Sequence, residues 1–209
     1  MTQLDIPPSE AAQAKPKLGR KRDHSRDPEI LEAALDVLAE TGYDGMTIDM
    51  VAARAKAGKA TLYRRWSSKG ELVIDAVACM KTIDFDALPD TGTLRGDLVA
   101  MIKSPSMVDA QRKMKVMTGL LSMISRDPEL ADAAYTAIIE PRALANRVLL
   151  DRAVARGEIA QNLDLERIAH LSQAMATYRT TVLREPVDRD FLIWVIDGVV
   201  LPAVGITPR

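Results

Sequence analysis

The sequence predicts an all-α protein of about nine helices, and three observations support this prediction. Ala, Leu, Met and Arg are plentiful, whereas aromatic residues make up only 4% of the chain, and unbranched side chains lose little rotamer freedom in a helix. Apolar residues recur at spacings of three and four in segment after segment, as on the buried face of a helix. No segment shows the strict apolar–polar alternation of a half-buried strand.

Residues 1–26 are predicted to form a flexible basic arm. They are rich in Pro, Lys, Arg and Ala and show no helical periodicity. The cations of the arm lie in its second half and include Arg20, Lys21 and Arg22. A charge run of this kind is commonly a solvated tail, and a binding role for it depends on the domain to which the arm is attached.

The first predicted helix begins at Asp27-Pro28-Glu29. This tripeptide offers a capping acceptor, a proline in the first turn and an acid near the helix N-terminus. Gly42 is expected to end the helix, because glycine readily adopts the left-handed conformation that closes many helices.

Three shorter helices are predicted next, over residues 48–55, 59–65 and 69–81. Thr47 and Ser68 are suitable capping residues for the first and the last of them. The break Lys56-Ala57-Gly58 leaves only a tight turn between the first two. Two short helices joined in this way indicate a helix-turn-helix, so residues 27–72 form the first predicted domain. Its inward-facing residues include Ile48, Val51, Ala52, Leu62 and Trp66.

Residues 73–209 are predicted to form a second helical domain. Its helices are expected over residues 94–103, 108–126, 127–156, 164–184 and 188–204. Asp127-Pro128-Glu129 repeats the helix-start signature, and Gly157 ends the helix that it opens. Pro141 lies inside this helix and should disturb it, because proline lacks a backbone donor and crowds the preceding turn.

Composition excludes several classes of protein and site. The formal net charge of −1 argues against a protein that coats nucleic acid over its whole surface. Cys79 is the only cysteine, and His24 and His170 lack zinc-site spacing, so no disulfide, metal or cofactor is expected. Without a signal peptide, and with an apolar stretch over residues 191–206 too short and interrupted to span a membrane, the chain is expected in the cytoplasm.

The helix-turn-helix carries a local basic patch. Between Arg54 and Lys69 the chain has six Lys or Arg and no acid. Since the apolar residues pack inward, all six cations are expected to point to solvent. An isolated basic patch on a small helix pair suits phosphate binding. The six are Arg54, Lys56, Lys59, Arg64, Arg65 and Lys69.

In a helix-turn-helix the second helix enters the major groove of DNA, and its N-terminal residues contact base edges. Base readout is therefore assigned to Lys59, Ala60 and Thr61, with Arg64 on the same side. Phosphate contacts are assigned to Thr47, Lys56, Tyr63 and Lys69. The arm residues Arg20, Lys21 and Arg22 are candidates for the minor groove, with a solvated tail as the alternative.

The segment 27–72 resembles the TetR (tetracycline repressor-like) family. Matching residues are Thr47-Ile48, Val51-Ala52, Ala55, Thr61-Leu62-Tyr63, Trp66 and Lys69-Gly70-Glu71-Leu72. The turn departs from the family's usual Gly-Val-Ser, since Lys56 stands at a position that often needs positive φ and Gly58 replaces the Ser cap. The resemblance implies a homodimeric regulator that a small-molecule effector releases from a palindromic double-stranded operator. That the regulator is a repressor follows from the family trait alone.

The last two predicted helices are unusually apolar. A terminal helix that is apolar nearly all round must be covered. A two-fold partner that completes a four-helix bundle would cover it, as the resemblance also implies; an intrachain core is the alternative. The predicted interface residues are Ile168, Leu171, Met175, Leu192, Val195 and Val199.

The resemblance also implies an effector pocket between about Arg95 and Tyr178. Methionines adapt to varied ligands but also fill ordinary cores, so both interpretations stay open. The predicted lining is Met101, Met117, Leu121, Tyr135, Ile138, Met175 and Tyr178. Arg142 and Arg179 could bind an acidic ligand or lie on the surface.

Two other classes of function fit the sequence less well. An all-helical enzyme is disfavoured, because no nucleophile or acid–base signature appears in the sequence. A non-specific DNA organiser or a pure dimerisation module is disfavoured by the near-zero net charge.

Overall fold

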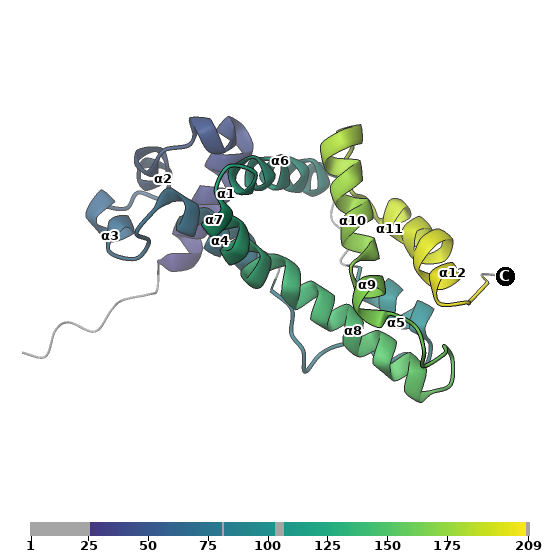
Figure 1. Cartoon of the computed structure of the whole chain (residues 1–209). Helices are drawn as coiled ribbons and strands as arrows, with labels where there is room; N and C mark the ends of the chain where they lie inside the picture. The colour runs from purple at the N-terminus through teal and green to yellow at the C-terminus, as the bar shows by residue number, and fades with distance from the viewer. Residues whose placement is uncertain (1–25, 81, 103–106, 208–209) are drawn as a thin grey trace, which may run out of the picture.

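The computed structural model describes residues 26–80, 82–102 and 107–207, and the all-α prediction is confirmed in these ranges (Figure 1). The first half contains α1 (Asp27–Gly45), α2 (Ile48–Arg54), α3 (Lys59–Tyr63), α4 (Lys69–Met80), α5 (Leu94–Ala100) and α6 (Met107–Ile124). The second half contains α7 (Pro128–Ala134), α8 (Glu140–Ala155), α9 (Leu165–Ala169), α10 (Leu171–Tyr178), α11 (Arg189–Val195) and α12 (Leu201–Ala203). Three π-helical turns, η1 (Tyr135–Ile139), η2 (Arg179–Leu183) and η3 (Ile196–Val200), join some of these helices end to end.

The disturbance predicted at Pro141 takes the form of the π-helical turn η1. Within the continuous stretch α7–η1–α8, the amide of Glu140 donates to the carbonyl of Tyr135, five residues back. Pro141 has no amide hydrogen and its ring crowds the carbonyl four residues earlier, and a wider turn relieves both problems without breaking the helix.

Both ends of α1 differ from the sequence prediction. Gly42 has the expected positive φ of 69°, but its ψ of 173° is not left-handed helical, and a last helical turn continues to Gly45. Asp27 was predicted to cap α1, and this was wrong. Arg26 occupies the cap position without a side-chain bond, and the Asp27 carboxylate forms an ion pair with Arg65 instead.

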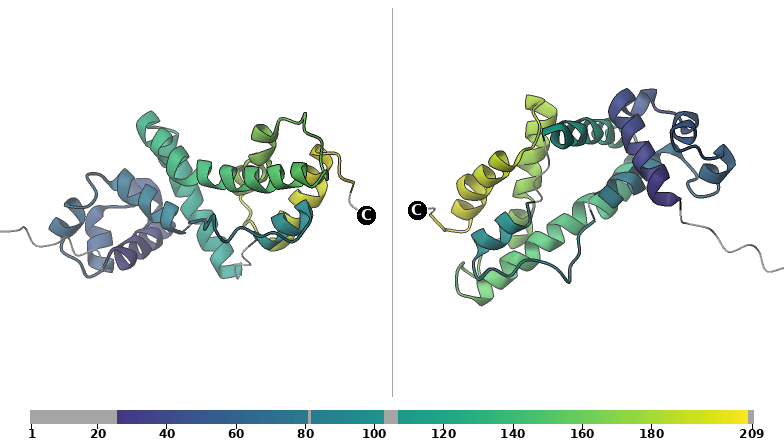
Figure 2. Two further views of the ribbon diagram at one scale, coloured as in Figure 1. Left: turned by 90° about the horizontal axis from the view of Figure 1, so that it is seen from below. Right: turned by 180° about the vertical axis from the view of Figure 1, so that it is seen from behind.

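Buried apolar side chains form two cores. The first contains residues of α1 to α4, α6, α7 and η1, among them Leu38 and Ile138. The second contains residues of α5 and α8 to α12, among them Leu149 and Val200. Figures 1 and 2 show α2 and α3 at one end of the molecule and α12 at the opposite end. The first core continues past Leu72 to Ile138, so the predicted domain boundary after Leu72 divides helices that pack together. The domain division therefore stays a prediction.

Helix α6 links the first core to η2. It packs against α1 and also contacts η2 (Figure 1). Gly119 makes the first contact close: a Cβ atom there would lie 2.7 Å from Leu38 Cδ1, which belongs to a fully buried side chain. Arg112 of α6 adds ion pairs to Glu32 and Asp36 of α1, each 2.7 Å long.

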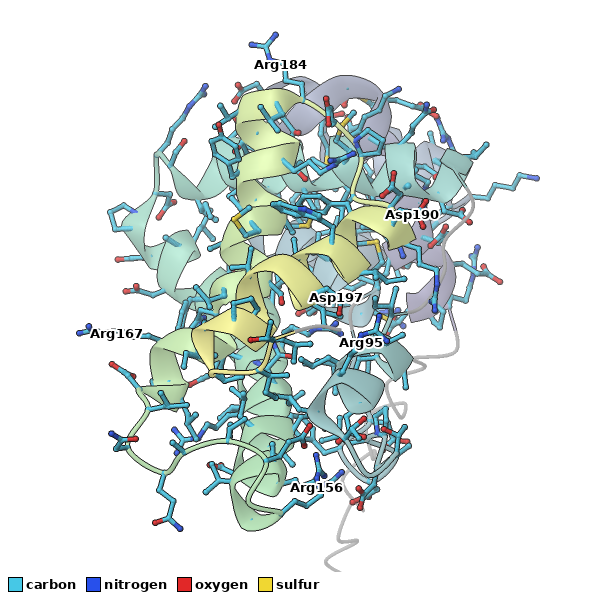
Figure 3. The ribbon with its side chains drawn as sticks, turned by 90° about the vertical axis from the view of Figure 1, so that its right-hand side faces the viewer. Arg95, Arg156, Arg167, Arg184, Asp190 and Asp197 are labelled. Carbon is cyan, nitrogen blue, oxygen red and sulfur yellow. The ribbon has the colours of Figure 1, made fainter. Side chains whose placement is uncertain are left out.

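Charged groups tie α5 to the far end of the fold. Arg95 Nε lies 2.7 Å from Asp197 Oδ1, and Arg95 Nη2 lies 2.9 Å from Asp197 Oδ2 (Figure 3). Hydrogen bonding from Arg95 lowers the pKa of Asp197 below its usual value. Asp97, which is fully buried, accepts from the Thr91 amide at 2.6 Å, from Thr91 Oγ1 at 2.8 Å and from Arg156 Nη2 at 3.2 Å.

Candidate nucleic-acid interface

Local contacts build the helix pair α2–α3 as predicted. Thr47 caps α2, since its Oγ1 accepts from the Met50 amide at 3.2 Å. The turn after α2 closes with a bond of 2.9 Å from the Ala57 amide to the Ala52 carbonyl. Lys56 has a φ of 49°, so the positive φ expected at the usual glycine position is present. The predicted inward residues are all buried, namely Ile48, Val51, Ala52, Leu62 and Trp66.

Arg26 fixes the end of α2. Its Nη2 donates to the Ala55 carbonyl at 2.7 Å, and its Nη1 donates to the Lys56 carbonyl at 3.3 Å. Carbonyls at a helix C-terminus lack intrahelical donors, so a cation placed there both satisfies them and complements the helix dipole. The chain entering α1 is thereby held to the turn between α2 and α3.

Four residues of α3 and its C-terminal end form an outward surface. Lys59, Ala60 and Arg64 are exposed, and Tyr63 is 57% exposed. Their spacing of one, three and four residues places them on one side of the short helix. Thr61 is half-buried beside them, so this predicted base-reading residue is less open than its neighbours.

The six cations of the basic patch do not all point to solvent, and the prediction was wrong for two of them. The Arg65 side chain is only 11% exposed and pairs with Asp27. Lys69 Nζ donates to the Tyr43 carbonyl at 2.7 Å and to the Met46 carbonyl at 3.0 Å, and it lies 4.2 Å from the centroid of the Tyr43 ring. In this structure the Lys69 ammonium therefore closes the α1–α2 connection and does not face outward toward a phosphate.

Two other cations are held in exposed ion pairs. Arg54 bonds to Glu40 through two nitrogens, and these bonds lower the pKa of Glu40. Lys59 pairs with Asp49. Exposed pairs of this kind contribute little to stability and exchange readily, so Lys59 stays available to another anion. Lys56 and Arg64 make no ion pair within the described residues, so their charges are uncompensated.

The internal role of Lys69 leads to a first prediction. We expect Lys69→Met to lower the free energy of unfolding by about 2 kcal/mol, because two carbonyls lose a charged donor. In a chain of this size the melting temperature should fall by roughly 4–8 °C. Thermal unfolding followed by circular dichroism would measure this change.

Lys113→Met is the matched control, because Lys113 is exposed on α6 and has no partner among the described residues. Its melting temperature should stay within about 1 °C of the wild type. Equal melting temperatures for the two variants would contradict the internal role and return Lys69 to the phosphate-binding candidates.

A hollow lies where α4 ends beside η1. It has a volume of about 330 Å³. Of the seven predicted pocket residues only Ile138 lines it. Pro141, which was expected to disturb this helix, lines it too. Sequence reasoning missed the other five residues, which come from the end of α4, from the stretch just after it and from η1. They are Ala78, Cys79, Thr82, Ile83 and Ala137.

The other predicted pocket residues lie elsewhere. Tyr135 is 47% exposed and stacks on His170, and Tyr178 is 50% exposed, so neither side chain is enclosed within the chain. Met101 and Met175 pack against the second core, and Met117 packs against the first, which is the ordinary-core alternative. Leu121 is half-buried.

The predicted dimer residues are mostly turned toward the second core. Val195 is fully buried within one chain, so it is not offered to a partner. Ile168, Leu171, Met175, Leu192 and Val199 are half-buried and pack against the same core. The large apolar side chains that these helices expose are Tyr178, Val182, Leu183 and Trp194.

Some expectations fall outside what the structure describes. The arm residues Arg20, Lys21 and Arg22 precede residue 26, so their predicted minor-groove role stays a prediction. Within the described ranges no group of three or more His, Cys, Asp or Glu residues could hold a metal ion. None of the described helices is long and apolar enough to cross a membrane.

Comparison with known proteins agrees with this geometry. Residues 30–76 match the profile of bacterial regulatory proteins of the tetR family, and residues 88–199 match the tetracyclin repressor-like C-terminal domain. The chain is 36% identical to the DNA-binding transcriptional repressor TetR of Mycobacteroides abscessus, over 86% of this chain and 94% of that protein. It is 33% identical to the HTH-type transcriptional regulator YdeS of Bacillus subtilis, over 84% and 88%.

The fold has counterparts among solved structures. A TetR transcription regulator from Haloarcula marismortui superposes with a TM-score of 0.64 at 14% identity, over 88% of this chain and 98% of that one. At this identity the likeness shows the fold alone.

Proposed function

Because the chain belongs to the tetR family of bacterial regulatory proteins, whose members are transcriptional regulators that bind DNA, we propose that it is a sequence-specific repressor. In this proposal a homodimer binds a near-palindromic operator in the cytoplasm and leaves it when a small-molecule effector binds. The observation that carries the proposal is the outward surface of α3, where Tyr63 is exposed beside the uncompensated charge of Arg64.

The exposed residues divide by the contacts that they suit. Lys59 and Ala60 are the first residues of α3, and this part of a recognition helix reaches base edges. We assign base readout to them and, because it is half-buried, a smaller share to Thr61. Lys56 and Tyr63 suit phosphate oxygens. We assign Arg64 to phosphate as well, in place of the base readout expected from the sequence, because it caps the C-terminal end of α3 and base edges are reached from the N-terminal end. Thr47, exposed at the start of α2, presents its hydroxyl where helix N-terminal amides also favour anions.

Selection of bound duplexes from a random pool tests this function. We expect an inverted repeat whose half-sites lie about one helical turn apart, roughly 34–36 Å, because a two-fold dimer presents two copies of α3. Binding should also weaken steeply as salt is raised. A pool that yields no consensus, together with equal affinity for unrelated sequences at moderate salt, would refute sequence-specific recognition.

Exposed apolar side chains support the homodimer. Tyr178 and Val182 are four residues apart and are 50% and 60% exposed, and Trp194 is 55% exposed. Residues four apart lie on one helix face, and large apolar side chains exposed on such a face indicate a protein–protein interface. We propose that these exposed side chains, together with the half-buried predicted residues, meet their two-fold copies in a four-helix bundle.

A charge among these exposed side chains should separate the subunits. We expect Val182→Asp to shift the mass measured by light scattering from two chains of 22.9 kDa to one, because burial of an unpaired carboxylate is strongly unfavourable. Thr181→Asp is the matched control, since Thr181 is the exposed neighbour in the same turn. A Val182→Asp variant with the same mass as Thr181→Asp would place the dimer interface elsewhere.

A further inference from the structure

Arg142 stands in the middle of a buried stripe that runs from η1 into α8. Ile138, Ala145 and Leu149 occupy the same helix face at spacings of four, three and four residues, and at most 3% of each is exposed. Ile138 belongs to the first core, whereas Ala145 and Leu149 belong to the second. The Arg142 side chain therefore starts at the seam between the two cores, on the face that points into the molecule.

The charge of Arg142 has no partner in the described structure. The residue is half-buried, and neither a hydrogen bond nor an ion pair links its guanidinium to any described residue. Burial alone lowers the pKa of Arg142 below its ordinary value. Removal of a cation from water without a counter-charge costs several kcal/mol in general, so an apolar residue here would stabilise the chain. An uncompensated interior charge of this kind is typical of a ligand site.

A second unsatisfied polar group reaches the end of η1, just before α8 begins. Gln173 of α10 donates from Nε2 to the Ile139 carbonyl at 3.0 Å. Its Oε1 is buried and accepts no hydrogen bond. Most buried polar atoms in proteins have a partner. The start of α8 therefore has a free cation and a free acceptor, contributed by two different helices.

The hollow beside α4 supplies the apolar space. Ile138 and Pro141 line it, and they precede Arg142 by four residues and by one. The rest of its lining is small or apolar apart from Thr82 and Cys79. An apolar space with a few polar groups at its edge is the usual form of a small-molecule site.

We propose that this seam binds a small organic anion with an apolar body, whose acidic group pairs with Arg142. A hydrogen-bond donor on the same molecule would satisfy Gln173 Oε1, and the apolar body would occupy the hollow. The inference rests on the proposed function, because it assigns a chemical class to the effector of that regulator.

Two fluorescent probes that differ in one charged group test the proposal. Anilinonaphthalene sulfonate is an apolar anion, and phenylnaphthylamine has the same ring system without the sulfonate. We expect Arg142→Met to weaken binding of the sulfonate about tenfold or more, because a charge-assisted contact in a partly buried site is lost. Affinity for the neutral probe should change less than about twofold, and Arg142→Lys should keep part of the sulfonate affinity.

Arg167→Met is the control for loss of a positive charge. Its side chain is 90% exposed on α9 and points away from the body of the molecule (Figure 3). The melting temperature of Arg142→Met without probe should rise by about 2 °C or more, because a costly interior charge is removed. Equal sulfonate affinity in the Arg142→Met and Arg167→Met variants would overturn the proposal. So would a wild type that binds neither probe, or an Arg142→Met variant that unfolds.

Operator binding separates this proposal from the proposed function. The same protein samples would be titrated with the duplex selected from the random pool. If the protein binds DNA specifically but its affinity for the sulfonate does not depend on Arg142, the anion site is refuted and the proposed regulatory function still stands. Arg142-dependent sulfonate binding without any specific DNA binding would support the site and refute the regulator.

Discussion

Replacement of Lys56 and Arg64 by alanine should weaken operator binding on the order of 10²–10³-fold at physiological salt, since a dimer loses four phosphate contacts worth about 1 kcal/mol each. These two cations have no carboxylate partner in the described residues, so no local ion pair must break before they bind DNA. The slope of log affinity against log salt should fall by roughly 3–4 units.

Fluorescence anisotropy with the selected duplex, repeated over a range of salt concentrations, would measure both quantities. Arg167→Ala serves as the control, because Arg167 carries the same charge on an exposed side chain of α9, at a distance from α3. The loss should be of similar size on specific and random duplexes. An unchanged salt slope in the double variant would show that neither residue contacts phosphate.

The Asp97→Ala variant should lose about 3 kcal/mol of folding free energy, the largest stability effect that we expect from one substitution. Three donors would lose their acceptor, among them the Thr91 amide and the Arg156 guanidinium. Arg156 would remain in place with one fewer counter-charge. The melting temperature should fall by roughly 6–12 °C.

Asp90→Ala is the matched control, because the Asp90 carboxylate pairs with the same Arg156 at 3.5 Å but is 67% exposed. Its effect should stay below about 0.5 kcal/mol. Asp97→Asn should lie between the two, since an amide oxygen still accepts from Thr91. If Asp90→Ala and Asp97→Ala melt at the same temperature, burial of Asp97 has no energetic consequence.

Features specified by nearby residues were predictable from the sequence. The caps at Thr47 and Ser68 and the disturbance at Pro141 depend on neighbours within about five residues, whereas the positive φ at Lys56 was implied by the resemblance to the TetR family. The Ser68 cap is present, since its Oγ accepts from the Glu71 amide at 3.1 Å. Helical periodicity predicted the inward faces for the same reason.

Features that depend on distant contacts were not predictable. Arg65 meets Asp27, which is 38 positions earlier, and Lys69 reaches the carbonyl of Tyr43, which is 26 positions earlier. Neither spacing has a local signature, so both cations were expected in solvent. The hollow joins the end of α4 to η1, and only the packed structure shows which side chains face it. Apolarity likewise does not distinguish a buried Val195 from an exposed Val182.

The unbroken helical stretch from Pro128 to Ala155 has a consequence for how the protein melts. It places Ile138 in one core and Leu149 in the other. Loss of either core would leave half of this helical stretch without packing. A helix of this length has only marginal stability in water without tertiary contacts. Unfolding at one end should therefore propagate to the other, so that the chain melts as one cooperative unit.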